Sequence, residues 1–291
     1  MKEFLLKHFL KQTPEHLLYP GPQFSPENTV VNYIWIDYKP WKSSGPGDAL
    51  CGARLSYFDK AYEQALQNPD AQFIMWVDFS RMDDLARFWV TSHYANWVRD
   101  NFGDLESPRV NLKLKDISKL PDYQQASLQI PETDLYKTRR PDLARLYVMR
   151  ECLRIMPEKT YIMYCDLDVE NVRIGCPQSQ RILGQHGMVH TYVTSLNNRD
   201  KGEFLGLGYF IFRRDIAENF LNKLIPVAEK RVVTYGDSGI CGAMMLALID
   251  WQAEAPGRKT KELIHPDRKI LYPVGHITPE DPIYAELGIN Y

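Results

Sequence analysis

Apolar and polar positions along the chain form short apolar runs and longer stretches of helical spacing that follow one another in turn. The first run, residues 29–36, is mostly apolar and is typical of a buried strand. The next segments alternate helix, strand, helix and strand, in the order 54–67, 72–79, 83–101 and 109–114. Such an alternation predicts an α/β fold with a mainly parallel sheet and helices on both faces.

The second half of the chain continues this alternation after a segment at 118–137 that is expected to be irregular. A helix is expected over 141–156. Three strands should follow, at 161–168, 188–193 and 208–212. Additional C-terminal helices are expected at 217–230 and 238–252. Ligands of α/β sheets bind outside the carboxyl ends of the strands. We therefore expect functional residues where the strands end.

The chain has 291 residues, of which 44% are hydrophobic and 25% charged, as in ordinary globular proteins. We expect a single domain over 29–291, preceded by a helical extension over 1–28. Residues 2–11 are too short and too charged an apolar stretch for a secretory signal or a membrane span. They predict a short amphipathic helix that packs on the domain or makes a weak peripheral membrane contact. No other window approaches a transmembrane segment.

Charge and cysteine content exclude several classes of function. The 35 Lys and Arg residues are balanced by 37 Asp and Glu, so no basic field favours nucleic acid as a partner. The five cysteines are widely spaced, odd in number and form no CxxC pattern. This arrangement argues against a disulfide framework and against structural zinc, and it indicates reduced thiols.

The most informative segment is the apolar run 161–168, which ends in Asp166 and Asp168. Two carboxylates spaced i, i+2 at a strand end should emerge together at the rim of the sheet, where they can hold a divalent metal. Asp-x-Asp is common by chance, however. Taken alone, this pair is equally compatible with solvated carboxylates at a strand terminus.

Two other strand ends place an aromatic ring beside a carboxylate. Trp35 is followed by Asp37, and Trp76 is followed by Asp78. Such a pair suits a nucleoside, because the ring can stack on a base while the carboxylate accepts hydrogen bonds from the base or the ribose. The alternative is that both tryptophans are core residues of buried strands.

Several motifs of the sequence, and the order in which they occur, resemble those of the GT-A glycosyltransferases. This group includes the catalytic domains of clostridial glucosylating toxins, related bacterial effector transferases and yeast-type initiating mannosyltransferases. The matching segments are Ile34-Trp35, Trp76-Val77-Asp78, Asp142-Leu143-Ala144-Arg145 and Tyr164-Cys165-Asp166-Leu167-Asp168. The resemblance covers residues 29–215. Each motif is degenerate, but their ordered combination is more specific than any one of them.

Two departures prevent assignment to a subfamily. Residues 156–160 replace the Gly-Gly pair that usually precedes the metal strand. The His-Glu-Asn motif of the arginine-modifying effector transferases is also missing from the sequence, so the acceptor of those enzymes is not indicated.

The resemblance implies a GT-A, Rossmann-like fold and a metal-dependent transfer of a hexose from a nucleotide sugar to a protein or glycan acceptor. A UDP-sugar is the favoured donor and a GDP-sugar is possible. Close relatives retain the anomeric configuration, and the sequence offers no obvious general base for inversion. A cytoplasmic protein is implied, or one that is secreted into a host cell without a cleaved signal peptide.

The resemblance also assigns roles to individual residues. Asp168, with Asp166 acting through water or ribose, would hold Mn²⁺ or Mg²⁺, which stabilises the leaving diphosphate together with a nearby arginine. That arginine would be Arg145, and Asp142 would bind hydroxyls of the donor sugar. The nucleotide pocket would be lined by Ile34, Trp35, Asp78 and Tyr164, with Asp166.

Simpler interpretations stay open. Asp142 follows Pro141 in a first helical turn, where a carboxylate is favoured by the helix dipole, and Arg145 is its i+3 partner. A nucleotidyltransferase or sugar-nucleotide pyrophosphorylase would need a phosphate loop, for which only Gly45-Pro46-Gly47 is available. A binding protein on a transferase fold would keep the fold without activity. Asp237 is either a helix cap or a donor ligand.

Overall fold

A six-stranded sheet forms the centre of the protein. The computed structural model describes residues 21–37, 41, 49–129, 139–167, 174–175, 179–180, 183–184, 187–194 and 203–235. The strands are β1 (Thr29–Trp35), β2 (Gln72–Val77), β3 (Leu112–Asp116), β4 (Tyr161–Cys165), β5 (Met188–Thr194) and β6 (Glu203–Arg213). Their order in the sheet is β3-β2-β1-β4-β6-β5.

Four neighbouring strands run parallel, and β6 runs antiparallel to both β4 and β5. Strand β1 lies between β2 and β4, with Asn32 opposite Ile74 on one side and Tyr164 on the other. The chain leaves β1 toward β2 and β3 and later returns to add β4 on the opposite side of β1. The carboxyl ends of β1 and β4 therefore flank a topological switch point, which is where α/β sheets form ligand crevices.

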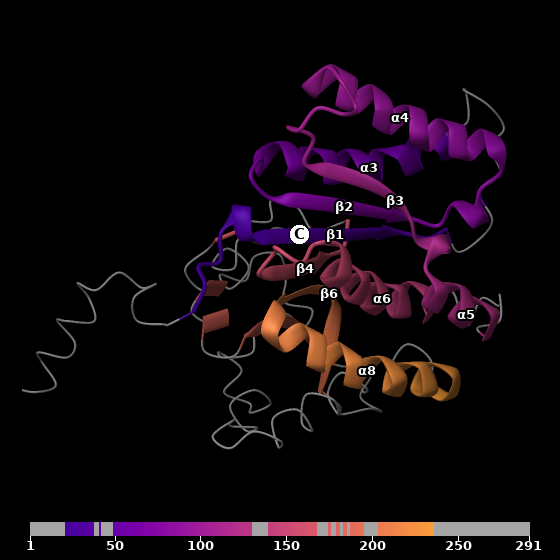
Figure 1. The fold of residues 1–291 in the computed structure, drawn as a ribbon. Coiled ribbons are helices and arrows are strands. Elements are labelled where there is room, and N and C mark those ends of the chain that lie inside the picture. The colour runs from indigo at the N-terminus through magenta and orange to yellow at the C-terminus, as the bar shows by residue number, and fades with distance from the viewer. Residues whose placement is uncertain are drawn as a thin grey trace, which may run out of the picture.

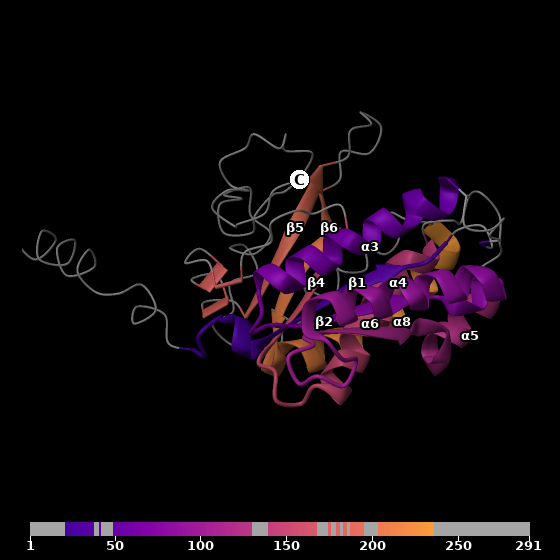
Figure 2. The same ribbon diagram turned by 90° about the horizontal axis from the view of Figure 1, so that it is seen from above.

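Helices cover both faces of the sheet (Figure 1). On one face lie α3 (Ala49–Gln67) and α4 (Asp84–Phe102), which are in front of the sheet in Figure 2. On the other face lie α5 (Pro121–Gln129), α6 (Arg139–Ile155) and α8 (Arg214–Tyr235). The predicted mainly parallel α/β architecture is confirmed.

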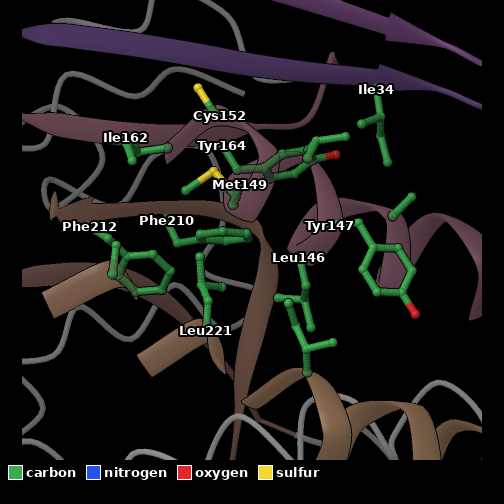
Figure 3. Packing of buried hydrophobic residues seen from close by; sticks show 14 of the residues in the cluster. Ile34, Leu146, Tyr147, Met149, Cys152, Ile162, Tyr164, Phe210, Phe212 and Leu221 are labelled. Carbon is green, nitrogen blue, oxygen red and sulfur yellow. The ribbon is translucent and has the colours of Figure 1, made fainter. Parts of the chain in front are cut away.

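Each face has its own apolar core, because side chains alternate along the strands. On β1, Val30 and Ile34 belong to the core under α5, α6 and α8, whereas Val31 and Tyr33 belong to the core under α3 and α4. Figure 3 shows the first of these cores, with the ring of Tyr164 beside that of Phe210. Apolar residues on both faces explain why the central strands read as nearly continuous hydrophobic runs.

Local capping fixes where α4 begins and ends. The carboxylate of Asp83 accepts a hydrogen bond from the backbone N–H of Ala86 at 2.8 Å, which satisfies one of the first N–H groups of the helix. Gly103 ends the helix with a φ of 84°, a conformation that glycine adopts without steric penalty.

The element boundaries differ from the sequence prediction in a few places. The segment at 118–137 is not irregular throughout, because it contains η3 (Ile117–Lys119) and α5. Pro121 begins α5 at a position where a missing N–H costs nothing, and Tyr123 and Ala126 bury its inner side. Strand β6 begins at Glu203 rather than near 208. Residues 1–20 of the extension expected over 1–28 lie outside the described residues, and so does the helix expected over 238–252. Residues 21–28 are described and contain the short helix η1 (Pro26–Asn28).

Among the described residues, none of the helices combines the length and hydropathy that a membrane crossing requires.

A buried polar group joins the three central strands. The side-chain amide of Asn32 on β1 donates to the carbonyl of Met163 on β4 at 3.1 Å and accepts from the indole N–H of Trp76 on β2 at 3.0 Å. Asn32 is fully buried. These bonds specify the register of β1 against both neighbours, because a shift by one residue would bury the amide without partners.

We predict that Asn32→Ala lowers the free energy of unfolding by about 1–3 kcal/mol, because the indole N–H of Trp76 loses its acceptor inside the core. Urea denaturation measures the change. Asn101→Ala is the control, since the exposed Asn101 bonds only a carbonyl of its own helix, and its effect should stay within about 0.5 kcal/mol. Equal effects of both substitutions would contradict the role assigned to Asn32.

Candidate functional site

Four aspartates mark the carboxyl ends of the four parallel strands. Asp37 lies two residues after β1, Asp78 follows β2, Asp116 is the last residue of β3, and Asp166 follows β4. Because parallel strands end at the same edge, these side chains lie along one rim of the sheet. Their surroundings divide them into two groups.

Asp78 and Asp116 cap short turns. Each begins an Asp-x-Ser sequence and accepts a hydrogen bond from the serine N–H two residues later, from Ser80 to Asp78 at 3.1 Å and from Ser118 to Asp116 at 3.0 Å. Both also accept from the hydroxyl of the same serine. The turns they cap are η2 (Phe79–Arg81) and η3.

Asp78 has a further partner that the sequence did not indicate. Its second oxygen accepts from the hydroxyl of Tyr123 on α5 at 2.6 Å, and Asp78 is only 1% exposed. Burial first, and then the charge of Asp78, raise the pKa of Tyr123 well above its usual value, so Tyr123 donates this bond. The structure thus gives Asp78 a capping role, and its proposed contact with a nucleotide stays a prediction.

Arg145 is the centre of the second group. Its guanidinium donates to the carboxylate of Asp142 at 2.8 Å, to the carboxylate of Asp166 at 3.2 Å and to the hydroxyl of Tyr164 at 3.2 Å. The hydroxyl of Tyr164 in turn donates to the other oxygen of Asp166 at 2.6 Å. Four of the residues selected from the sequence are therefore brought together beside the switch point.

This group is largely shielded from water. The side chains of Arg145, Asp142 and Asp166 are 17%, 10% and 29% exposed. Burial disfavours the charged guanidinium, but Tyr164, Asp166 and Asp142 outweigh it, so the pKa of Arg145 is raised above its ordinary value. Burial, followed by the charge of Asp166, also raises the pKa of Tyr164 well above its usual range. Arginine stays charged and the phenol stays neutral.

The guanidinium of Arg145 has hydrogen-bonding capacity beyond its bonds to this group. A guanidinium has more N–H donors than the three bonds of Arg145 use, and its charge is held in place rather than left to move with a flexible side chain. A phosphate oxygen or a sugar hydroxyl that approaches would meet a preorganised donor at low conformational entropy cost. Asp142 offers acceptor oxygens in the first turn of α6.

Trp35 lies apart from this group, on the other face of the sheet. The indole of Trp35 packs against the rings of Tyr57 and Phe58 of α3, with centroid distances of 5.2 and 5.8 Å, and its N–H donates to Asp37 at 3.2 Å. Ile34, by contrast, is a core residue on the same face as Tyr164. Trp35 and Tyr164 therefore lie on opposite faces of the sheet.

The metal site predicted from Asp166 and Asp168 is described only in part, because Asp168 lies outside the described residues. No cluster of three Asp, Glu, His or Cys side chains that could hold a metal occurs in the described part of the chain. Asp166 fits a metal only partially, since both of its oxygens already accept hydrogen bonds from Arg145 or Tyr164. The loop with Gly45-Pro46-Gly47 and the cap candidate Asp237 also lie outside the described part.

Sequence reasoning missed two supporting residues. Tyr57, which is 42% exposed, packs in a tilted arrangement against Trp35, and Tyr123 donates a hydrogen bond to Asp78. The repeated Asp-x-Ser sequence was an available signal that Asp78 and Asp116 are caps. No local pattern predicts the bond from Tyr123, because it joins residues 45 positions apart.

A separate cavity of about 410 Å³ lies between α5, α6 and α8. It is lined by residues such as Tyr147, Arg150 and Arg214, and by none of the strand-end aspartates. Its arginines are engaged: Arg150 pairs with Asp122, and Arg214 donates to the backbone carbonyls of Lys159, Leu153 and Met156. The cavity is therefore distinct from the strand-end site.

Comparison with known proteins gives a faint similarity. No protein-family model matches the chain, and no curated protein matches it. Two solved transferase structures are similar, one of them a double cysteine-to-serine mutant. The mutant has a TM-score of 0.48 and 11% identity, over 83% of this chain and 91% of the other. The second has a TM-score of 0.46 and 11% identity, over 93% and 94%.

The mannosyltransferase Ktr4p from S. cerevisiae is similar with a TM-score of 0.39 and 10% identity, over 79% of this chain and 69% of that one. At TM-scores and identities this low, none of the three similarities carries an argument about activity. The site must be judged on its own geometry.

We predict that Trp35→Ala weakens nucleotide binding by about 1–3 kcal/mol, because a base would lose its stacking surface. A purely structural Trp35 would instead cost about 3–5 kcal/mol of unfolding free energy and leave nucleotide affinity unchanged. Nucleotide titrations and urea denaturation of the same variant separate these outcomes. Trp89→Ala is the control, since Trp89 is a half-buried tryptophan that packs against the same core from α4.

Proposed function

We propose that this protein is a glycosyltransferase that binds a nucleotide sugar at the carboxyl ends of β1 and β4 and transfers its hexose to a protein or glycan acceptor. The observation that supports the proposal best is the guanidinium of Arg145, held by Asp142, Tyr164 and Asp166 beside the switch point. A largely buried and preorganised cation is what a leaving diphosphate requires.

In this proposal each residue of the group has its own task. Arg145 directs its remaining N–H donors at the diphosphate or donor sugar and stabilises the charge that develops as the glycosidic bond breaks. Asp142 accepts from hydroxyls of the sugar while it fixes one side of the guanidinium. Tyr164 keeps its proton and orients both Arg145 and Asp166. Trp35, supported by Tyr57, offers the ring on which the base stacks.

A divalent cation, Mn²⁺ or Mg²⁺, would be held by Asp168 together with Asp166. When bound, it would neutralise charge on the diphosphate. Because the oxygens of Asp166 are already engaged by Arg145 and Tyr164, a contact through water or ribose suits this residue better than direct ligation. A UDP-sugar is the favoured donor, a GDP-sugar is the alternative, and retention of configuration is the proposed outcome.

We predict that Arg145→Lys lowers the rate of donor-sugar hydrolysis by about 100-fold, because an ammonium cannot reproduce the planar fork that contacts three acceptors at once. Nucleotide release from UDP- and GDP-sugars measures the rate without knowledge of the acceptor. Arg154→Lys is the control on the same helix: Arg154 also pairs with an acidic i−3 residue, but its side chain is 73% exposed. A folded Arg145→Lys protein that releases nucleotide at the wild-type rate would refute the assigned role.

We also predict that UDP or GDP binds more tightly in Mn²⁺ than in EDTA, and that Asp168→Asn removes this difference while the metal-free affinity stays unchanged. The physical reason is that a bound divalent cation adds an attractive charge for the diphosphate. Isothermal titration calorimetry measures the four affinities. Equal affinities in both conditions, for wild type and variant alike, would exclude the metal from the proposal.

A further inference from the structure

Strand β6 lies beside the strand that carries Tyr164 and leads to Asp166. It pairs antiparallel with β4, so that Tyr164 lies opposite Phe210. The two rings stack, with centroids 5.1 Å apart and planes inclined by 25° (Figure 3). Two residues further along each chain segment, the backbone N–H of Asp166 donates to the carbonyl of Gly208 at 2.8 Å. Phe210 thus lies opposite Tyr164, and Gly208 lies opposite Asp166, the residue that follows β4.

Gly208 leaves the space that the carboxylate of Asp166 occupies. A Cβ atom on residue 208 would lie 2.9 Å from Oδ2 of Asp166 and 3.7 Å from its Cγ. The first distance is shorter than van der Waals contact, so a side chain at 208 would force this oxygen to move. Nη2 of Arg145 lies 3.2 Å from this Oδ2 and 3.1 Å from Oδ1, so movement of the carboxylate would disturb its contact with Arg145.

Asp166 cannot move without losing partners. Its two oxygens are held by Arg145 and by the hydroxyl of Tyr164, and its backbone is fixed to β6. A displaced carboxylate would weaken its hydrogen bond and ion pair with Arg145, and the guanidinium would be held less firmly in its present orientation.

We propose that Gly208 is a positioning residue of the site. Because it has no side chain, the carboxylate of Asp166 can lie against β6 and hold Arg145 toward the donor. This inference rests on the proposed function for its catalytic consequence, whereas the steric relation between Gly208 and Asp166 is independent of it. Gly208 touches no reacting atom and acts through Asp166.

The catalytic consequence is tested by donor hydrolysis. Gly208→Ala should lower kcat by about 10- to 100-fold, since small displacements of a positioned group have effects of this size. Gly21→Ala is the matched control, because a Cβ there would meet only ordinary contacts at 3.7 and 3.9 Å, and its rate should equal that of the wild type. A wild-type rate for Gly208→Ala, in an assay that the wild type supports, overturns the inference and leaves the proposed function intact.

The steric relation is tested by urea denaturation of the full chain in three backgrounds. In wild type and in Asp166→Asn, which keeps the shape of the side chain, Gly208→Ala should lower the midpoint. In Asp166→Ala the clash is removed, so the same substitution should leave the midpoint unchanged or raise it by restricting the unfolded chain. An equal shift in all three backgrounds overturns the inference. If the wild type cleaves none of the nucleotide sugars, the proposed function fails while this comparison still decides the role of Gly208.

Discussion

The pairing of β1 with β2 on one side and β4 on the other is the constraint on which the rest of the structure depends. It places a strand buried on both faces at the centre, and the amide of Asn32 joins it to both neighbours. The same pairing creates the switch point at which Arg145, Tyr164 and Asp166 meet. Fold and candidate site therefore share one origin.

Burial of the Arg145 group is hard to explain by stability alone. Removing a guanidinium and two carboxylates from water carries a large desolvation penalty, which their mutual attraction only partly offsets. Well-packed apolar residues at these positions would serve the fold at least equally well. A charged group retained in a largely buried position at a strand edge is better explained by a ligand whose charge it meets.

The sequence predicted most of the fold because its strands are long apolar runs and its helices keep their spacing. The mainly parallel sheet, α4 and α6 follow from that periodicity. Helix α5 was missed since it is short and its inner side is set by contacts with distant residues. The order of the strands in the sheet, with β6 antiparallel beside β4, depends on pairing between distant segments. The hydrophobic periodicity of the sequence does not encode this pairing.

The candidate site was predictable in its composition but not in its connections. The Asp142 and Arg145 pair follows from i, i+3 spacing on a helix, and the strand-end position of Asp166 from its apolar run. Strand register determines the remaining features of the site. It places Tyr164 between Arg145 and Asp166, Trp35 on the other face of the sheet, and Gly208 opposite Asp166. The position of Asp168 and the affinity for a metal stay predictions.

The capped turns after β2 and β3 have an evolutionary consequence. Asp78 and Asp116 each close their own turn through a serine two residues away, so each strand end is capped by residues close to it in sequence, and Asp78 is held in addition by Tyr123. Loops at this rim are thus free to change in length and sequence without fraying the sheet.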